Sequence, residues 1–221
     1  MKTFAQIREM AVTRKGEEAI AAYVPDPLQT PLASLTDDRL LSEFSKRVFQ
    51  SGFNWKVVEN KWPGFETAFH GFDIGRNAMM SDEDLDRHLK NTGIVRHATK
   101  ILSVRDNAVF MSDLAREHGS AAQFIGNWPV SDTIGLLDMM KKRGNRLGGA
   151  TGQYALRFAG YENFILSRSV IAALNMAGVI DGAATSKGAQ VKVQAALNIW
   201  QSESGESQAR ISRVLAMSVP D

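Results

Sequence analysis

The chain has 221 residues, of which 44% are hydrophobic and 23% are charged, and its formal net charge is +2. This composition is typical of a folded protein with a sizeable core and excludes a disordered chain. The lack of cysteine excludes disulfides, thiolate zinc sites and thiol nucleophiles, and no apolar run is long enough for a membrane span. We therefore expect a cytoplasmic protein. Because the net charge is small, any surface that binds a polyanion must be a local basic patch.

The first 35 residues contain three prolines, all in the stretch VPDPLQTP at 24–31. Prolines at this density interrupt regular structure, so we expect residues 1–35 to form an irregular N-terminal arm. The arm is expected to pack on a helical domain formed by residues 36–221.

The remaining segments have the start and stop signals of helices. A helix is predicted from Thr36, where a capping residue and two acids precede an apolar stripe. Ser81, with Asp84 three residues later, has the pattern of a capping box. A long amphipathic stretch stops at Gly119, and another helix is predicted from Ser131 to a basic last turn before Gly144. No segment alternates as a strand does, so the predicted fold class is all-α.

Two tryptophans, Trp55 and Trp62, stand seven residues apart in the stretch FQSGFNWKVVENKW at 49–62. This spacing is typical of two aromatic residues on one face of a helix, where both would belong to the core. Alternatively, one of them forms the floor of a pocket for a flat ligand. The stretch alone leaves both interpretations open.

The stretch KKRGNRLGGATGQYALRFAG at 141–160 predicts two helices joined by a glycine-rich hairpin at about 144–149. The consecutive glycines can adopt positive φ and expose their N–H groups, and the following helix adds its own free N–H groups. Such a hairpin binds a phosphate and grips a DNA backbone without reading sequence. The alternative is a plain interhelical turn whose basic residues offset the helix dipole. The predicted DNA-binding residues of this stretch are Lys142, Gly144, Arg146, Gly148, Gly149 and Thr151.

Three further motifs carry a resemblance to a known family. QSGFNW at 50–55, FHGFD at 69–73 and GIVRHATKI at 93–101 resemble, in order and spacing, the motifs of the 3-methyladenine DNA glycosylase I family. KKRG at 141–144 and the segment 149–170 resemble the second half of that family and of its helix–hairpin–helix superfamily. The resemblance covers about residues 36–180 and implies a helix–hairpin–helix DNA glycosylase fold, a helical bundle with a cleft.

The resemblance implies a monofunctional enzyme of base-excision repair, which flips a damaged base from double-stranded DNA and hydrolyses its N-glycosidic bond. Such a protein is expected to act as a monomer, with no cofactor and no membrane partner. Trp55 matches the pocket tryptophan of the family, whereas Trp62 is expected in the core or groove wall. His97 is expected at the DNA-binding face, with a structural histidine as the alternative. The predicted base-binding residues are Trp55, Arg47, Gln50, Phe53 and, from a faint match in the arm, Tyr23.

The sequence departs from the family in its metal ligands. The family holds a structural zinc through cysteine and histidine near its termini. This chain has no cysteine, and its histidines, at positions 70, 88, 97 and 118, stand away from both ends. We therefore expect no zinc.

A second departure concerns the pocket. The family has a glutamate eight residues before the pocket tryptophan, and Arg47 stands at that position here. Arg47 lies at the margin of the apolar stripe, so it either points into the pocket or extends outward and pairs with Glu43. If it faces the pocket, a cationic 3-methyladenine should be repelled and a neutral, acceptor-rich base should fit better.

No catalytic residue follows from the sequence. Most of the superfamily has an aspartate after the hairpin, where this chain has Ser167 and Arg168, and Asp73 is expected to cap or brace a helix. The leading hypothesis is a DNA glycosylase of the 3-methyladenine type. The alternatives are a glycosylase-like protein that binds DNA without releasing a base or prefers another lesion, and a helical interaction protein without DNA binding.

Overall fold

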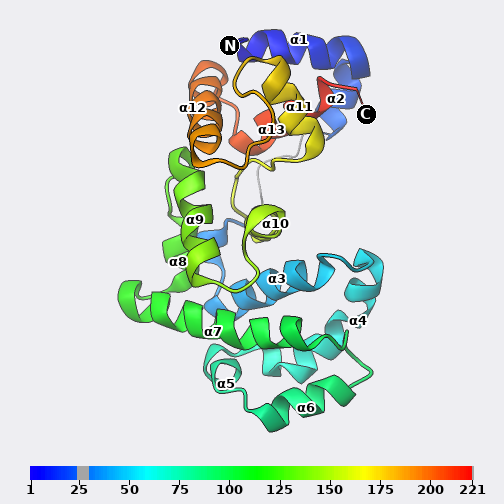
Figure 1. Cartoon of the computed structure of the whole chain (residues 1–221), viewed down its shortest axis with the longest axis vertical. Coiled ribbons are helices and arrows are strands. Elements are labelled where there is room, and N and C mark those ends of the chain that lie inside the picture. Colours follow the sequence, from blue (N-terminus) through cyan, green and yellow to red (C-terminus); the bar gives the residue numbers. More distant parts are fainter. Residues whose placement is uncertain (24–29, 221) are drawn as a thin grey trace. The chain divides into compact units, whose positions relative to one another are not determined.

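The computed structural model describes residues 1–23 and 30–220, and these residues form helices and loops without a strand (Figure 1). The predicted all-α class is therefore confirmed. The chain divides into two units, the first comprising Met1–Gln29, Pro129–Leu136 and Glu162–Asp221, and the second Thr30–Trp128 and Leu137–Tyr161. Among the described residues, no helix is long and apolar enough to span a membrane.

The first unit joins the two ends of the chain around one core. Its elements are α1 (Phe4–Lys15), α2 (Glu17–Tyr23), η3 (Val130–Asp132), α11 (Arg168–Met176), α12 (Lys187–Ser204) and α13 (Gln208–Met217). Helix α1 packs against α12 and α13, and the indole N–H of the fully buried Trp200 donates to the Lys2 carbonyl over 3.0 Å.

Residues 1–23 differ from the irregular arm expected from the sequence. Thr3 and Gln6 form a capping box that starts α1, and Phe4, Ile7 and Ala11 bury one face of this helix. The prolines that suggested an arm all follow Tyr23, so they do not interrupt α1 or α2. The division of the chain consequently does not fall at residue 35.

The second unit is arranged around α3 (Asp37–Gln50), which packs against α4 (Trp55–Ala68), α7 (Ala98–His118) and α10 (Gly149–Phe158). Its other elements are η1 (Leu32–Ser34), η2 (His70–Phe72), α5 (Ile74–Ala78), α6 (Asp82–Lys90) and α8 (Ala121–Gly126). Helix α9 (Thr133–Arg143) has its first four residues in the first unit and the rest in the second. A run of buried aromatic side chains fills this core, namely Phe44, Phe49, Trp62, Phe65, Phe69 and Phe72.

Several local predictions hold in this unit. Ser81 and Asp84 form the predicted capping box of α6, and α7 ends at Gly119, whose φ is +88°. Trp62 is buried, stacks on Phe65 and donates its indole N–H to Glu66 over 3.1 Å. Its interpretation as a core residue is thus confirmed. Asp73 caps α5 by accepting from the Arg76 amide, as expected.

The hairpin before α10 is held tightly against the first turn of that helix. A Cβ on Gly152 would lie 2.2 Å from the Leu147 carbonyl oxygen, a distance that no side chain tolerates. Leu147 itself is fully buried, so the hairpin backbone has little room to withdraw. Gly152 therefore permits the close approach of hairpin and helix.

We predict that Gly152→Ala lowers the free energy of unfolding by about 1–3 kcal/mol, because the added methyl group forces the hairpin away from α10. Urea denaturation followed by circular dichroism measures the effect. Gly188→Ala is the control, since Gly188 is also helical but has no atom within 4 Å of the added Cβ. It should leave stability unchanged or raise it by up to about 1 kcal/mol. Equal losses in the two variants would show that close packing at Gly152 is not the cause.

Candidate nucleic-acid interface

The end of α3 is held by one buried lysine, Lys100, near the start of α7. Its ammonium donates to the carbonyls of Val48, over 2.8 Å, and Phe49, over 3.2 Å, and also to that of Ser51. The last carbonyls of a helix have no partner within the helix, so a cation is favoured at this position. Lys100 Nζ also lies 4.6 Å from the centre of the Phe53 ring. Lys100 thereby fixes the loop from Ser51 to Asn54 to the start of α7.

Burial, and to a smaller extent the positive charge of Arg146, lower the pKa of Lys100 to about 8. Sequence reasoning assigned no role to Lys100, although it stands inside the motif GIVRHATKI. The only sign in the sequence that Lys100 is buried is its position among apolar residues of a predicted helix. That signal does not reveal which carbonyls the side chain reaches.

The predicted hairpin lies between α9, which ends at Arg143, and α10, which begins at Gly149. The Asn107 side chain exchanges two hydrogen bonds with the Asn145 backbone, of 2.8 and 3.0 Å. Of the two glycines expected to adopt positive φ, Gly149 does so at +59°, whereas Gly148 is extended at −86°. Gly148 caps α10 without a side-chain hydrogen bond, which leaves N–H groups of the first turn open to a ligand.

The loop and the hairpin border one cavity of about 280 Å³. Its lining residues are Val48, Ser51, Arg146, Gly148 and Thr151. The structure therefore brings residues from two distant predicted motifs, QSGFNW and the hairpin, to a single place.

His97 and Phe53 lie next to this junction. Thr99 Oγ1 accepts from Arg146 over 2.9 Å and lies 3.1 Å from His97 Nδ1. The His97 and Phe53 rings meet edge to face at 5.9 Å. His97 thus has a hydrogen-bond partner, as a structural histidine would, and it also adjoins the loop and hairpin.

The basic residues of the hairpin region differ in their partners. Lys142 pairs with Asp138 at 2.6 Å, and Arg143 makes two hydrogen bonds to Glu117, of 3.0 and 2.8 Å. Among the described residues, Arg146 is bonded to a hydroxyl and to no carboxylate. Arg146, which is exposed, is therefore better placed than Lys142 to meet a phosphate.

Three aromatic residues, Trp55, Tyr154 and Phe158, form an exposed group that we call the aromatic cluster. Their ring centres lie 5.7–6.4 Å apart, and 43% of Trp55 and 49% of Phe158 are exposed to solvent. A contiguous group of exposed aromatic side chains marks a candidate surface for a ligand or a partner. The sequence pointed to Trp55 alone, because nothing in the residues around Tyr154 and Phe158 marks the face of α10 that meets α4.

The guanidinium of Arg47 lies against the aromatic cluster, 4.1 Å from the Phe158 ring centre and 5.6 Å from that of Trp55. The side chain is 6% exposed and donates to Gln50 over 2.6 Å and to Glu43 over 3.1 Å. Arg47 therefore pairs with Glu43, as one of the two alternatives has it, but it does not extend outward, and its guanidinium lies over the Trp55 ring.

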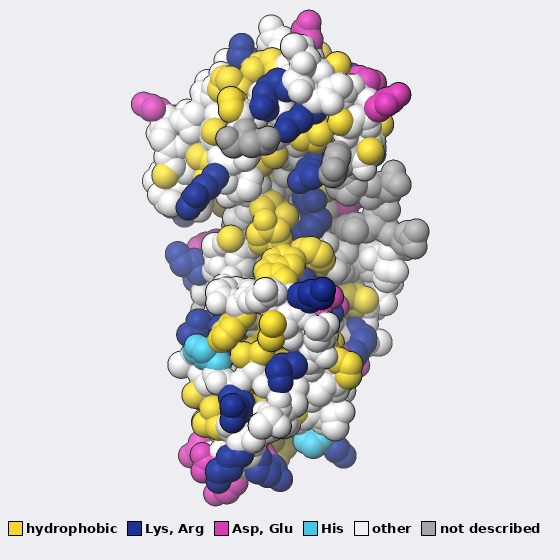
Figure 2. Space-filling view, turned by 90° about the vertical axis from the view of Figure 1, so that its right-hand side faces the viewer, with side chains coloured by type: hydrophobic (Ala, Val, Ile, Leu, Met, Phe, Trp, Pro, Cys, Tyr) yellow, Lys and Arg dark blue, Asp and Glu magenta, His cyan; other side chains and the backbone are white. Residues whose placement is uncertain are grey.

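Gln50 extends this network to a second acid. Its amide N–H donates to Glu59 over 3.3 Å, and Glu59 lies 3.8 Å from Lys46. The negative charges of Glu43 and Glu59 therefore balance the positive charges of Arg47 and Lys46 beside the aromatic cluster. In the space-filling view, hydrophobic side chains adjoin Lys and Arg on the part that holds α3 to α7 (Figure 2). The side chain of Tyr23, the remaining predicted base-binding residue, lies outside the described residues.

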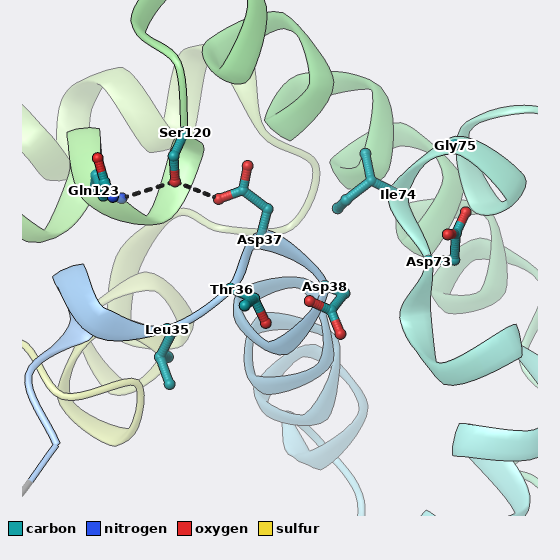
Figure 3. A pocket seen from close by; sticks show the side chains of 9 residues that line it. All are labelled: Leu35, Thr36, Asp37, Asp38, Asp73, Ile74, Gly75, Ser120 and Gln123. Atoms are coloured by element: carbon teal, nitrogen blue, oxygen red, sulfur yellow. Dashed lines mark hydrogen bonds between the residues drawn. The ribbon is translucent and has the colours of Figure 1, made fainter.

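A larger cavity of about 500 Å³ lies at the opposite end of α3 and is lined by acids (Figure 3). Asp37 accepts from the Ser120 hydroxyl and from two amides at the start of α8, at 2.8–3.1 Å. Its carboxylate therefore serves as a helix cap, and the acidic lining disfavours a polyanion. Within the described ranges, no group of three or more potential metal ligands is present.

Comparison with known proteins identifies relatives of this chain. Residues 31–142 match the family model of methyladenine glycosylase. DNA-3-methyladenine glycosylase 1 of Escherichia coli (strain K12) is 37% identical over 59 residues, which are 27% of this chain and 32% of that protein. The corresponding enzyme of Haemophilus influenzae is 36% identical over the same shares. The chain thus spans about a third of the length of the curated relatives it matches.

Solved structures are similar to a larger part of this chain than these relatives are. A crystal structure of 3-methyladenine DNA glycosylase I is 28% identical, with a TM-score of 0.51 over 63% of this chain and 86% of that one. The 8-oxoguanine glycosylase/lyase of Methanocaldococcus jannaschii, solved in complex with DNA, covers 95% of this chain and 93% of its own. It has a TM-score of 0.50 at 14% identity, so this likeness concerns the fold alone. The predicted helix–hairpin–helix glycosylase fold is confirmed by these neighbours.

We predict that Lys100→Met lowers the free energy of unfolding by about 1–3 kcal/mol at pH 7, because it leaves the buried carbonyls of Val48 and Phe49 and the partly buried carbonyl of Ser51 without this donor. The difference between wild type and variant should grow from pH 8 to pH 10.5. Over that range the unfolded lysine keeps a proton that the folded one has lost, so stability rises with pH. Urea titrations at a series of pH values measure both effects. Lys192→Met, on the exposed face of α12, is the control, and a pH-independent difference would contradict the assignment.

Proposed function

Because the chain belongs to the methyladenine glycosylase family, we propose that it is a monofunctional DNA glycosylase. It would flip a damaged base out of double-stranded DNA and hydrolyse the bond between base and sugar. The observation that carries this proposal is the cavity shared by the loop after α3 and the hairpin before α10. Both segments come from one chain, so we expect a monomer to suffice.

The hairpin is the proposed phosphate site. Arg146 and the first turn of α10, whose N–H groups have no side-chain cap, both line the cavity. A helix N-terminus with a neighbouring arginine favours an anion and carries no preference for base sequence. Gly149, at positive φ with nothing within 4 Å of its Cβ position, leaves open space for a close approach of the backbone.

The aromatic cluster is the proposed base site. A flipped base has lost its stacking partners, and an aromatic side chain restores about 1–3 kcal/mol of stacking per base. Trp55 stands at the end of the loop, with Phe53 at its tip and Gly52 at φ +80° beside it. Phe53 is accordingly proposed to enter the gap that the flipped base leaves.

The proposed reaction is a hydrolysis at the sugar. The bond from C1′ to the base nitrogen breaks with both electrons leaving on the base, a water oxygen bonds to C1′, and the proton that this water loses is taken up by the departing base or by solvent. Lys100 is engaged with three carbonyls, so no covalent lysine intermediate is proposed.

A second candidate is a protein that binds damaged DNA without releasing the base. It is favoured by the state of the acids around the aromatic cluster, because Glu43 pairs with Arg47 and Glu59 with Lys46. Neither carboxylate is then free to activate a water or to stabilise positive charge on the sugar.

We predict that the protein releases free bases from randomly methylated or deaminated duplex DNA. Trp55→Ala should reduce release about five- to 100-fold, which corresponds to the loss of one stacking contact. Its affinity for undamaged duplex should stay within about twofold of wild type, because Trp55 is assigned to the base and not to the backbone. Chromatography of the supernatant identifies each released base.

Arg146→Ala tests the phosphate site, as Trp55→Ala tests the base site. It should weaken binding to every duplex and reduce the slope of log affinity against log salt by about 1, as expected for one lost phosphate contact. Arg143→Ala is its matched control, because Arg143 is neutralised by Glu117. Salt-dependent binding without release of any base would favour the second candidate. Equal losses of undamaged-DNA binding in Trp55→Ala and Arg146→Ala would refute the division into base site and phosphate site.

A further inference from the structure

We propose that the base site selects neutral damaged bases that present hydrogen-bond acceptors, such as a ring carbonyl, in preference to cationic methylated bases. Deaminated bases such as hypoxanthine and uracil belong to this class. The inference rests on the proposed function, because it assumes that the aromatic cluster receives a flipped base. It concerns which base is accepted, and not whether the base is released.

Three polar groups at the aromatic cluster have no hydrogen-bond partner among the described residues, and two of them can only donate a hydrogen bond. Arg47 Nε is buried and has no hydrogen-bond partner among the described residues, while its two outer nitrogens are held by Glu43 and Gln50. Within residues 1–23 and 30–220, neither the Trp55 indole N–H nor the Tyr154 hydroxyl has a hydrogen-bond partner. The first two groups can only donate, and the hydroxyl can donate or accept. A buried donor without a partner is costly, so an acceptor on the ligand would be favoured there.

Among the described residues at the aromatic cluster, each carboxylate is already paired with a cation, and the acceptor left without a partner is the neutral Tyr154 hydroxyl. Gln50 Oε1 is occupied by Arg47, Glu43 is paired with Arg47, and Glu59 is shared by Gln50 and Lys46. A methylated cationic adenine carries positive charge and an exocyclic amine, and both require an acceptor or a negative charge. The guanidinium at 4.1 Å from Phe158 places a fixed positive charge beside the stacking surface instead.

Stacking alone does not discriminate between these bases. Every base has a face that stacks on Trp55 or Phe158, so the cluster tolerates all of them. Discrimination must come from the hydrogen-bonding edge, where a site of donors rejects a base that lacks matching acceptors. Arg47 is therefore assigned as the specificity-determining residue of the site.

The test measures binding to duplexes of one sequence that carry adenine, hypoxanthine or the cationic 1-methyladenine at a single position opposite thymine. Wild-type protein should bind the hypoxanthine duplex about tenfold more tightly than the adenine duplex, as one hydrogen bond to a charged donor allows. The 1-methyladenine duplex should show no advantage over adenine. Fluorescence anisotropy at fixed salt gives the affinities.

Arg47→Lys keeps the charge but loses Nε and the planar fork. The advantage of hypoxanthine, measured as the ratio of the affinities for the hypoxanthine and adenine duplexes, should fall below about twofold in this variant. Tyr154→Phe is a milder variant that keeps the ring and should retain most of the advantage. A preference that arises only from weakened base pairing would persist in Arg47→Lys, and that result would overturn the inference.

The outcomes separate this inference from the proposed function. A preference for 1-methyladenine, or equal binding to all three duplexes, overturns the inference even if bases are released from damaged DNA. A hypoxanthine preference that depends on Arg47, without release of any base, supports the inference while the proposed hydrolysis fails.

Discussion

The arrangement of the site depends on one interaction, in which the ammonium of Lys100 meets the open carbonyls at the end of α3. Without a donor at this position, the chain after α3 would have to satisfy these carbonyls with water, and the short loop that follows would have no fixed direction. With the donor in place, the same loop delivers Phe53 toward His97 and Trp55 toward α10. The hairpin is held to α7 through Asn107, which stands seven residues after Lys100 and therefore on the same face of the helix, so α7 acts as a common support for both segments.

Arg47 stands where the family has a glutamate. It puts a cation with hydrogen-bond donors in place of an acceptor, and its side chain still fills the site. The arginine is compensated by Glu43 and held by Gln50, so its burial costs less than that of an isolated charge. Its guanidinium also lies against Phe158 and Trp55, where the faces of aromatic rings favour a cation. The site thus combines aromatic faces for stacking with hydrogen-bond donors. Its two acids, Glu43 and Glu59, are already paired with Arg47 and Lys46.

Much of the fold could be predicted because its signals are local. Terminal signals predicted the start of α6, from the capping box at Ser81, and the ends of α7 and α9, from Gly119 and from a basic last turn before Gly144. The seven-residue spacing of Trp55 and Trp62 did not by itself decide which of the two is buried. The contributions of Lys100, Tyr154 and Phe158 could not be predicted in this way, because each depends on which distant segment its helix faces. Helix α1 was missed for a different reason, since the prolines after Tyr23 concealed a capping box at Thr3.

The loop after α3 and the hairpin before α10 are proposed to act together on one DNA duplex. Amide hydrogen exchange, measured by mass spectrometry with and without a duplex that carries a damaged base, tests this proposal. Residues 51–55 and 146–152 should be protected together, while the acidic cavity around Asp37 exchanges as before. Protection of only one segment, or of the acidic cavity instead, would contradict it.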